Sequence, residues 1–139
     1  MAYQWDNSLE TGHQKIDNQH KQLISALNNL IEASSAGKGE EEIFKTLDFL
    51  TGYTIMHFGD EEKLQTKYDY PDYYVHKRIH DEFKNTVGIL TQRLRDEGPN
   101  RELVGEVTDT VGAWLLNHIR GDDFRMAAFV KTKEEAATV

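Results

Sequence analysis

Residues 75–80 read VHKRIH and place His76 and His80 four positions apart. Residues at i and i+4 of an α-helix lie one above the other on the same face, so this stretch presents two imidazoles together. The same stripe continues through Phe83, Val87 and Leu90 at alternating steps of three and four. This spacing is typical of a helix that turns one face towards a core, and it places both histidines on that face.

Three further segments, residues 16–30, 43–64 and 104–118, carry apolar residues at the same spacing. Helix-breaking clusters separate the segments, and they read SSAGKG at 34–39, KYDYP at 67–71 and DEGPN at 96–100. We therefore predict an all-α protein, an antiparallel up-down-up-down four-helix bundle with short loops. The expected helices cover roughly residues 13–34, 40–65, 71–96 and 100–120. A short C-terminal tail from Val130 onward has no stripe, and we expect it to fray.

Length and composition narrow the class of protein. The 139 residues suit a single domain, 1–139, with a core of its own. Sixteen Lys and Arg against 24 Asp and Glu give a net charge of −8, which argues against nucleic-acid and membrane-surface partners. The absence of cysteine excludes disulfides, thiolate metal sites and a cysteine nucleophile. Because no leader or membrane-spanning stretch is visible, we expect a cytoplasmic protein.

Five of the six histidines lie on the inward stripes at helix ends that share one end of the bundle. A lone core histidine is more often hydrogen-bonded than metal-bound, but in an antiparallel bundle all five meet at one end; they are His20, His57, His76, His80 and His118. Glu61 lies one turn after His57 on the same stripe, where an isolated buried charge is unfavourable unless a cation compensates it. The pattern predicts a di-metal site at one end of the core.

A second carboxylate follows His118 in the stretch HIRGDD, residues 118–123. On a regular helix Asp122, at i+4, lies below His118, and Asp123, at i+5, is rotated away. Gly121 intervenes, and a wide turn there would carry Asp123 inward instead. Spacing alone favours Asp122.

Together, DNQH at 17–20, HFGDE at 57–61, HKRIH at 76–80 and HIRGDD at 118–123, with Trp5 near the start, closely resemble the hemerythrin family, specifically the single-domain bacteriohemerythrins. This resemblance implies two non-haem iron ions with a bridging oxo or hydroxo group and dioxygen as reversible ligand. It implies that His76, His80 and His118 bind one iron, that His20 and His57 bind the other, and that Glu61 and Asp123 bridge them. It therefore favours Asp123 over Asp122.

Ligand chemistry agrees with iron, because imidazole and carboxylate suit this metal and two octahedral ions offer about twelve positions. The protein ligands and one bridging group fill about eleven of them, which leaves one position for dioxygen on the iron with fewer histidines. We expect a dry pocket there, although ordinary core packing explains most of the same residues: Leu23, Phe58, Trp114, Leu115 and Ile119. Asp17, Asn117 and Asp81 lie near the ligands in sequence, without an assigned role.

Dioxygen transport, storage or delivery is the interpretation we favour, with at most weak oxidase or peroxidase activity. One alternative is an oxygen or redox sensor acting through a separate protein partner, which the sequence does not identify. Another is an HD-type metal phosphohydrolase built on His80 and Asp81, but it leaves His20 and His118 unused. His13 lies on the first stripe about 10 Å from the metal layer, and we expect a structural or surface role for it.

Overall fold

The computed structural model describes residues 2–137, and these residues form helices and connecting segments without a strand. A short 3₁₀ helix, η1 (Asn7–Leu9), precedes the bundle. Three long helices follow, α1 (Gln14–Ser35), α2 (Gly39–Lys67) and α3 (Tyr73–Glu97). The fourth runs through α4 (Arg101–Glu106), η2 (Val107–Val111), α5 (Gly112–His118), η3 (Ile119–Asp123) and α6 (Phe124–Ala137).

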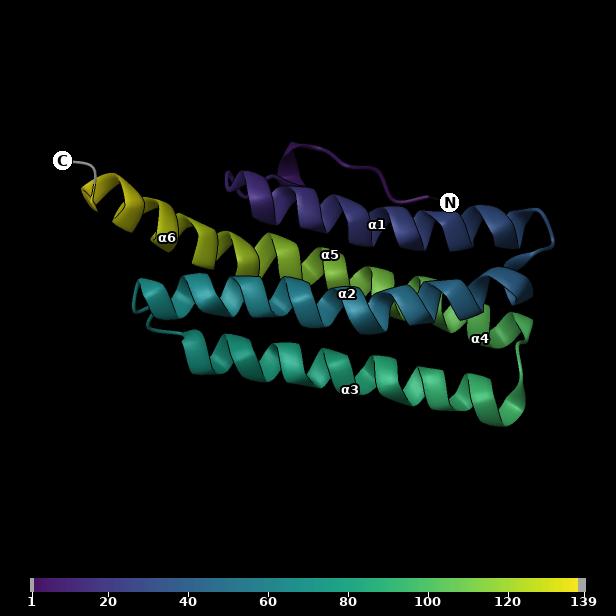
Figure 1. The fold of residues 1–139 in the computed structure, drawn as a ribbon. Coiled ribbons are helices and arrows are strands. Elements are labelled where there is room, and N and C mark those ends of the chain that lie inside the picture. The colour runs from purple at the N-terminus through teal and green to yellow at the C-terminus, as the bar shows by residue number, and fades with distance from the viewer. Residues whose placement is uncertain (1, 138–139) are drawn as a thin grey trace.

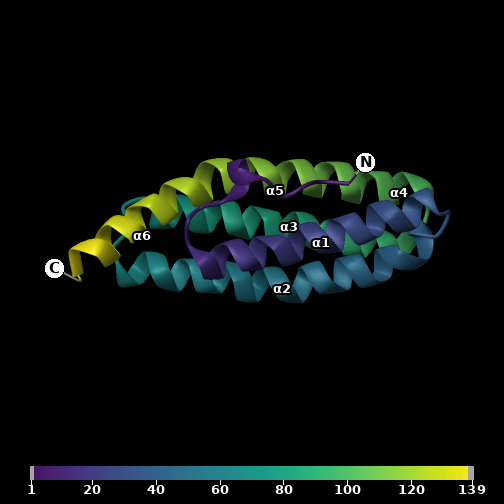
Figure 2. The ribbon, with the colours of Figure 1, turned by 90° about the horizontal axis from the view of Figure 1, so that it is seen from above.

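The four helices run antiparallel to their neighbours in sequence, so the predicted up-down-up-down bundle is confirmed (Figures 1 and 2). The three connections fall on the predicted breaker clusters. Gly37 and Gly98 take positive φ angles of 77° and 76°, a left-handed conformation that glycine adopts without a Cβ penalty. At the start of α4 the Asn100 side chain accepts a hydrogen bond from the Leu103 amide at 2.8 Å, which caps the last long helix.

The fourth helix does not end near residue 120, as expected, but continues to Ala137 and projects beyond the other helices in Figure 1. The expectation of a frayed tail from Val130 onward is therefore wrong for the described residues, and residues 138–139 lie outside them. Met126 and Val130 are completely buried and pack with Ile16 and Tyr70. This burial stabilises the first two turns of α6, which the isolated sequence pattern does not reveal.

Two segments of the fourth helix, η2 and η3, are π-helical, which means that each contains a wider turn than an α-helix. At η2 the Tyr3 hydroxyl donates to the Thr108 carbonyl at 2.8 Å. The backbone of Tyr3 exchanges two hydrogen bonds of 2.7 Å with the Asn28 side chain. The N-terminal arm thus joins α1 to the fourth helix, and it satisfies a carbonyl in the widened turn.

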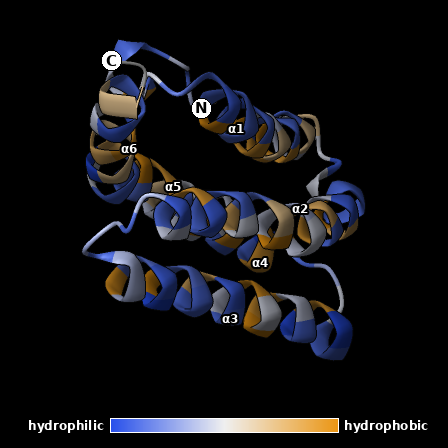
Figure 3. Cartoon of the chain, turned by 60° about the vertical axis from the view of Figure 1, so that its left-hand side comes forward, coloured by the Kyte–Doolittle hydropathy of each residue, from blue (hydrophilic) through white to orange (hydrophobic). Residues whose placement is uncertain are grey.

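Apolar side chains form two separate clusters along the bundle axis, and each helix alternates hydrophobic and hydrophilic residues (Figure 3). The larger cluster extends from the end of the bundle with the α1–α2 and α3–α4 connections to Leu23, Phe58 and Ile119. The smaller one closes the other end with Ile16 and Met126. Along α1, α2 and the fourth helix, a buried polar residue lies between the two clusters. Within residues 2–137, no helix has the length and apolarity needed to cross a membrane.

Candidate metal centre

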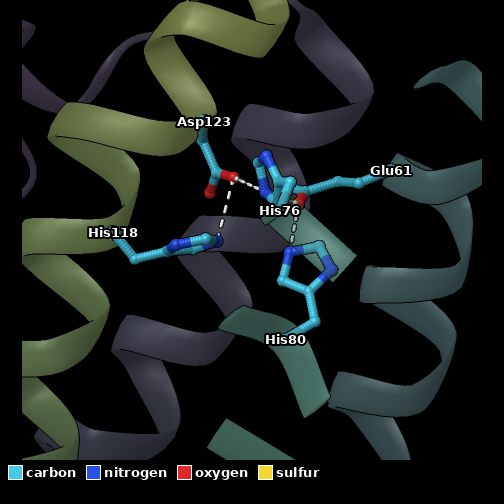
Figure 4. A group of neighbouring side chains, drawn as sticks. All are labelled: Glu61, His76, His80, His118 and Asp123. Atoms are coloured by element: carbon cyan, nitrogen blue, oxygen red, sulfur yellow. Dashed lines mark ion pairs between the residues drawn. The ribbon is translucent and has the colours of Figure 1, made fainter. Parts of the chain in front are cut away.

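All seven side chains expected as ligands are buried and meet between the two apolar clusters, each at most 3% exposed. They form two groups that share their carboxylates. The first holds His76, His80 and His118, the second holds His20 and His57, and both contain Glu61 and Asp123. Figure 4 shows the two carboxylates pointing at the three imidazoles of the first group from opposite helices.

Glu61 directs one oxygen to each histidine group. Its Oε1 lies 3.0 Å from His80 Nε2 and 3.4 Å from His76 Nε2. Its Oε2 lies 3.1 Å from His57 Nε2 and 3.3 Å from His20 Nε2. A carboxylate placed in this way can bridge two cations, with one oxygen for each.

Asp123 repeats the arrangement from the fourth helix. Its Oδ1 lies 3.0 Å from His76 Nε2 and 3.1 Å from His118 Nε2. Its Oδ2 lies 2.9 Å from His20 Nε2, which belongs to the second group. The two carboxylates therefore connect the same two sets of imidazoles.

The facing atoms fit a shared cation better than hydrogen bonds to one another. Despite their short separations, several have no well-directed hydrogen-bond partner among the described residues: the Nε2 atoms of His57, His76, His80 and His118, Glu61 Oε1, and both Asp123 oxygens. Two ligand atoms at right angles, each about 2.1 Å from a metal, lie about 3.0 Å apart. The nitrogen–oxygen distances cluster around this value. Imidazole and carboxylate together suit iron among the first-row metals.

The π-helical segment η3 determines which aspartate enters the cluster. Because a π turn holds more residues than an α turn, the residue at i+5 takes the position below His118 that i+4 occupies in an α-helix. Asp123 is accordingly completely buried. Asp122 instead lies behind the ring, where its Oδ2 accepts from His118 Nδ1 at 2.8 Å. The straight-helix preference for Asp122 inside the cluster is wrong.

In three of the imidazoles, the ring nitrogen that faces away from the cluster contacts a polar side chain, a different one for each ring. His57 Nδ1 lies 2.6 Å from Gln19 Oε1, His80 Nδ1 lies 2.9 Å from Glu62 Oε2, and His118 rests on Asp122 as described. These partners were not predicted from the sequence. A signal was nonetheless present, because Gln19, Glu62 and Asp122 each adjoin a predicted ligand in sequence.

Of the three residues singled out earlier by proximity in sequence, Asn117 is exposed, and Asp17 and Asp81 have other contacts. Asp17 accepts hydrogen bonds from the backbone amide and hydroxyl of Thr11, and so fixes the segment that precedes α1. Asp81 is half exposed and pairs with Lys77 and Lys84 at 3.2 Å. Because Asp81 does not join the cluster, the His-Asp pair required by a phosphohydrolase is not assembled here.

The buried charges shift one another's pKa values. Burial alone lowers the pKa of His20, His76 and His118, but the carboxylates of Asp123 and Glu61, joined at His118 by that of Asp122, outweigh it and raise the pKa to about 9, 9 and 10 respectively. Burial likewise raises the pKa of both carboxylates, yet the imidazoles hold the pKa of each well below its usual range. At neutral pH and without a cation, these three imidazoles therefore pair as imidazolium ions with the two carboxylates.

Aromatic rings cover the candidate ligands on the side that faces the larger apolar cluster. Phe58 stacks on His80 with ring centroids 3.9 Å apart, and Trp114 stacks on His118 at 4.5 Å. Leu23, Phe58, Leu115 and Ile119 are buried and Trp114 is partly exposed, so the residues expected to line a dry pocket lie in the adjoining apolar cluster.

His13 stands apart from the metal-ligand groups of the described residues. It precedes α1, and its Nε2 lies 3.8 Å from the Glu134 carboxylate of α6. This position agrees with the structural or surface role expected for it.

Comparison with known proteins adds an independent result. The model of the hemerythrin HHE cation binding domain matches residues 11–130. A bacteriohemerythrin of Pseudomonas aeruginosa is 34% identical over 94% of this chain and 88% of its own length. A myohemerythrin of Theromyzon tessulatum is 30% identical over 88% of this chain and 89% of its own. A crystal structure of wild-type hemerythrin superposes with a TM-score of 0.80 at 28% identity, covering 94% of this chain and 98% of that one.

Proposed function

The chain belongs to the hemerythrin family, and on that premise we propose that it binds dioxygen reversibly at two iron ions, for transport, storage or delivery. One observation carries the proposal. Glu61 and Asp123 each direct one oxygen towards the group of three histidines and the other towards the group of two. This is the donor arrangement that two neighbouring cations of the same kind require.

The proposed ligands divide unequally between the two ions. His76, His80 and His118 would hold one iron, and His20 and His57 the other, with Glu61 and Asp123 shared. When bound, the iron pair supplies the two electrons that reversible dioxygen binding requires. The side with two histidines has one protein donor fewer, so we place dioxygen there.

The protein's further contribution is to keep water and protons away from the centre. Leu23 follows His20 by one turn, Ile119 follows His118 directly, and both are at most 1% exposed. On the opposite side, Met126 and Val130 close the end of the bundle. A site that is dry on both sides favours release of intact dioxygen over its reduction, because reduction consumes protons.

An anaerobic titration tests the function directly. The purified protein, reduced and loaded with Fe²⁺, should contain two irons per chain and develop an oxo-to-iron absorption in the near ultraviolet and visible on addition of oxygen. The absorption should vanish under vacuum and return on re-exposure. One zinc per chain, or phosphatase activity without iron, would contradict the proposal.

A further inference from the structure

The two histidine groups differ in the side chains that contact the Nδ1 atoms of their rings, on the side away from the cluster. His80 and His118, in the group of three, rest on the carboxylates of Glu62 and Asp122. His57, in the group of two, rests on the neutral amide of Gln19. Support from a carboxylate raises the basicity of a metal-bound imidazole more than support from an amide does.

The Gln19 amide is itself held in one orientation. Its Nε2 lies 2.7 Å from Asp60 Oδ2, and because a carboxylate only accepts hydrogen bonds, the NH₂ end of the amide must face Asp60. The oxygen end then faces His57. Lys15 Nζ lies 3.5 Å from the same Asp60 oxygen and keeps that carboxylate paired at the surface.

This order of donors and acceptors determines which nitrogen of the neutral His57 ring carries the proton. A carbonyl oxygen 2.6 Å from Nδ1 requires the proton to be on Nδ1, since the oxygen cannot donate. In the neutral ring Nε2 then carries the lone pair, and Nε2 is the atom that faces Glu61 and the cluster. The orientation is thus transmitted from Asp60 through Gln19 to His57.

We propose that Gln19 is a positioning residue for the metal on the two-histidine side: anchored by Asp60, it fixes the metal-binding tautomer of His57 and gives that ring a neutral amide partner where His80 and His118 have carboxylates. The inference rests on the proposed metal pair. It adds that the two-histidine subsite is tuned from the surface, because Gln19 also lines an open hollow together with Lys15, Asn18 and Tyr53.

The contacts from Asp60 through Gln19 to His57 can be broken by one substitution and rebuilt by a pair of substitutions. Gln19→Leu keeps a side chain of similar size and removes the acceptor for His57. The double variant Gln19→Glu with Asp60→Asn exchanges the amide and the carboxylate, so that the carboxylate introduced at position 19 accepts from His57 and the amide introduced at position 60 donates to that carboxylate. Gln22→Leu is the matched control, since Gln22 is exposed one turn further along α1 and lines the same hollow.

Anaerobic titration with Co²⁺ against a competing chelator measures the two binding steps. We expect Gln19→Leu to weaken one step by about 10- to 100-fold and to leave the other within about threefold, as is typical when a partner of a ligating histidine is lost. The double variant should restore the weakened step to at least the wild-type affinity, and Gln22→Leu should match the wild type. Circular dichroism verifies that each variant is folded.

The tautomer gives a readout that a space-filling role would not change. In the diamagnetic Zn²⁺ form, the His57 Nδ1 proton should give a protected downfield resonance that is lost in Gln19→Leu and present in the double variant. Unchanged binding steps and an unchanged resonance in Gln19→Leu, or a double variant as weak as Gln19→Leu, would overturn this inference alone. Failure of the wild type to bind any metal would overturn the proposed function with it.

Discussion

Substitution of Asp123 by asparagine in the metal-free protein removes one negative charge from the centre of the cluster without changing the size of the side chain. The Asp123 oxygens lie 2.9, 3.0 and 3.1 Å from the Nε2 atoms of His20, His76 and His118. Around neutral pH these rings carry protons, because their pKa values are raised to about 9 or 10. Removing one partner of a buried ion pair costs about 3–5 kcal/mol of folding stability.

The size of this loss depends on pH with a definite sign. A histidine whose pKa is higher in the folded state stabilises the fold fully below its unfolded pKa, near 6.5, and loses that contribution as pH rises through the folded pKa. The loss caused by Asp123→Asn should therefore be largest near pH 6 and shrink towards pH 10. Above about pH 10, where all three rings have lost their added protons, Asp123 faces Glu61, whose charge raises the pKa of Asp123, so the substitution should become neutral or stabilising.

Urea unfolding followed by circular dichroism, with chelator present at about pH 6 and about pH 10, measures both values. Asp122→Asn is the control, because the Asp122 side chain is 24% exposed and also pairs with Arg125. Its effect should be about 1 kcal/mol at the lower pH, the ordinary size for a partly exposed hydrogen bond. An equal loss for Asp123→Asn at both pH values would refute the assignment of imidazolium–carboxylate pairs to the metal-free cluster.

Three further predictions address metal content, oxygen chemistry and packing. His118→Ala should lower both the iron content and the thermal stability of the iron-loaded protein, since a metal that binds only the folded chain adds to its stability, whereas His13→Ala should leave iron content unchanged by elemental analysis. Ile119→Glu places an acid beside the dry side of the centre and should speed autoxidation, followed as the decay of the oxygenated spectrum; an unchanged rate would argue that Ile119 does not line the pocket. Gly112→Ala should destabilise by about 1–2 kcal/mol in urea unfolding, because its Cβ would overlap the Tyr3 hydroxyl and break that hydrogen bond, while Gly52→Ala, with open space around it, should stabilise by about 0.5–1 kcal/mol.

The helices could be predicted because their stripes and breaks are local signals. The spacing around His76 and Val87 matches the buried face of α3, and Gly37 and Gly98 mark turns where only glycine is unstrained. The extension of the last helix was missed for a physical reason. The first turns of α6 are held by packing of Met126 with Ile16, which is more than a hundred residues away in sequence and cannot be inferred from the tail itself.

The site could be predicted as a set of residue types, but not in its detailed geometry. The inward position of His20 and of the other four imidazoles follows from helical periodicity together with bundle topology. The choice of Asp123 does not, because it depends on the π turn, and periodicity assumes a uniform helix. The resemblance to a known family supplied that choice. The role of Gln19 could not be predicted from the sequence either, because a glutamine next to a candidate ligand can have many surface roles. Only its contacts with Asp60 and His57 distinguish the role proposed here.

The widened turn η3 has a consequence beyond the choice of aspartate. Everything that follows it on the helix is rotated by the extra residue, so the same insertion that carries Asp123 inward also brings Met126 and Val130 onto the face that closes the end of the bundle. Making residues 118–123 regular α-helix without removing a residue would therefore turn Asp123 out of the cluster and turn Met126 and Val130 off that face together. Any variant or design that regularises this helix must repair both at once.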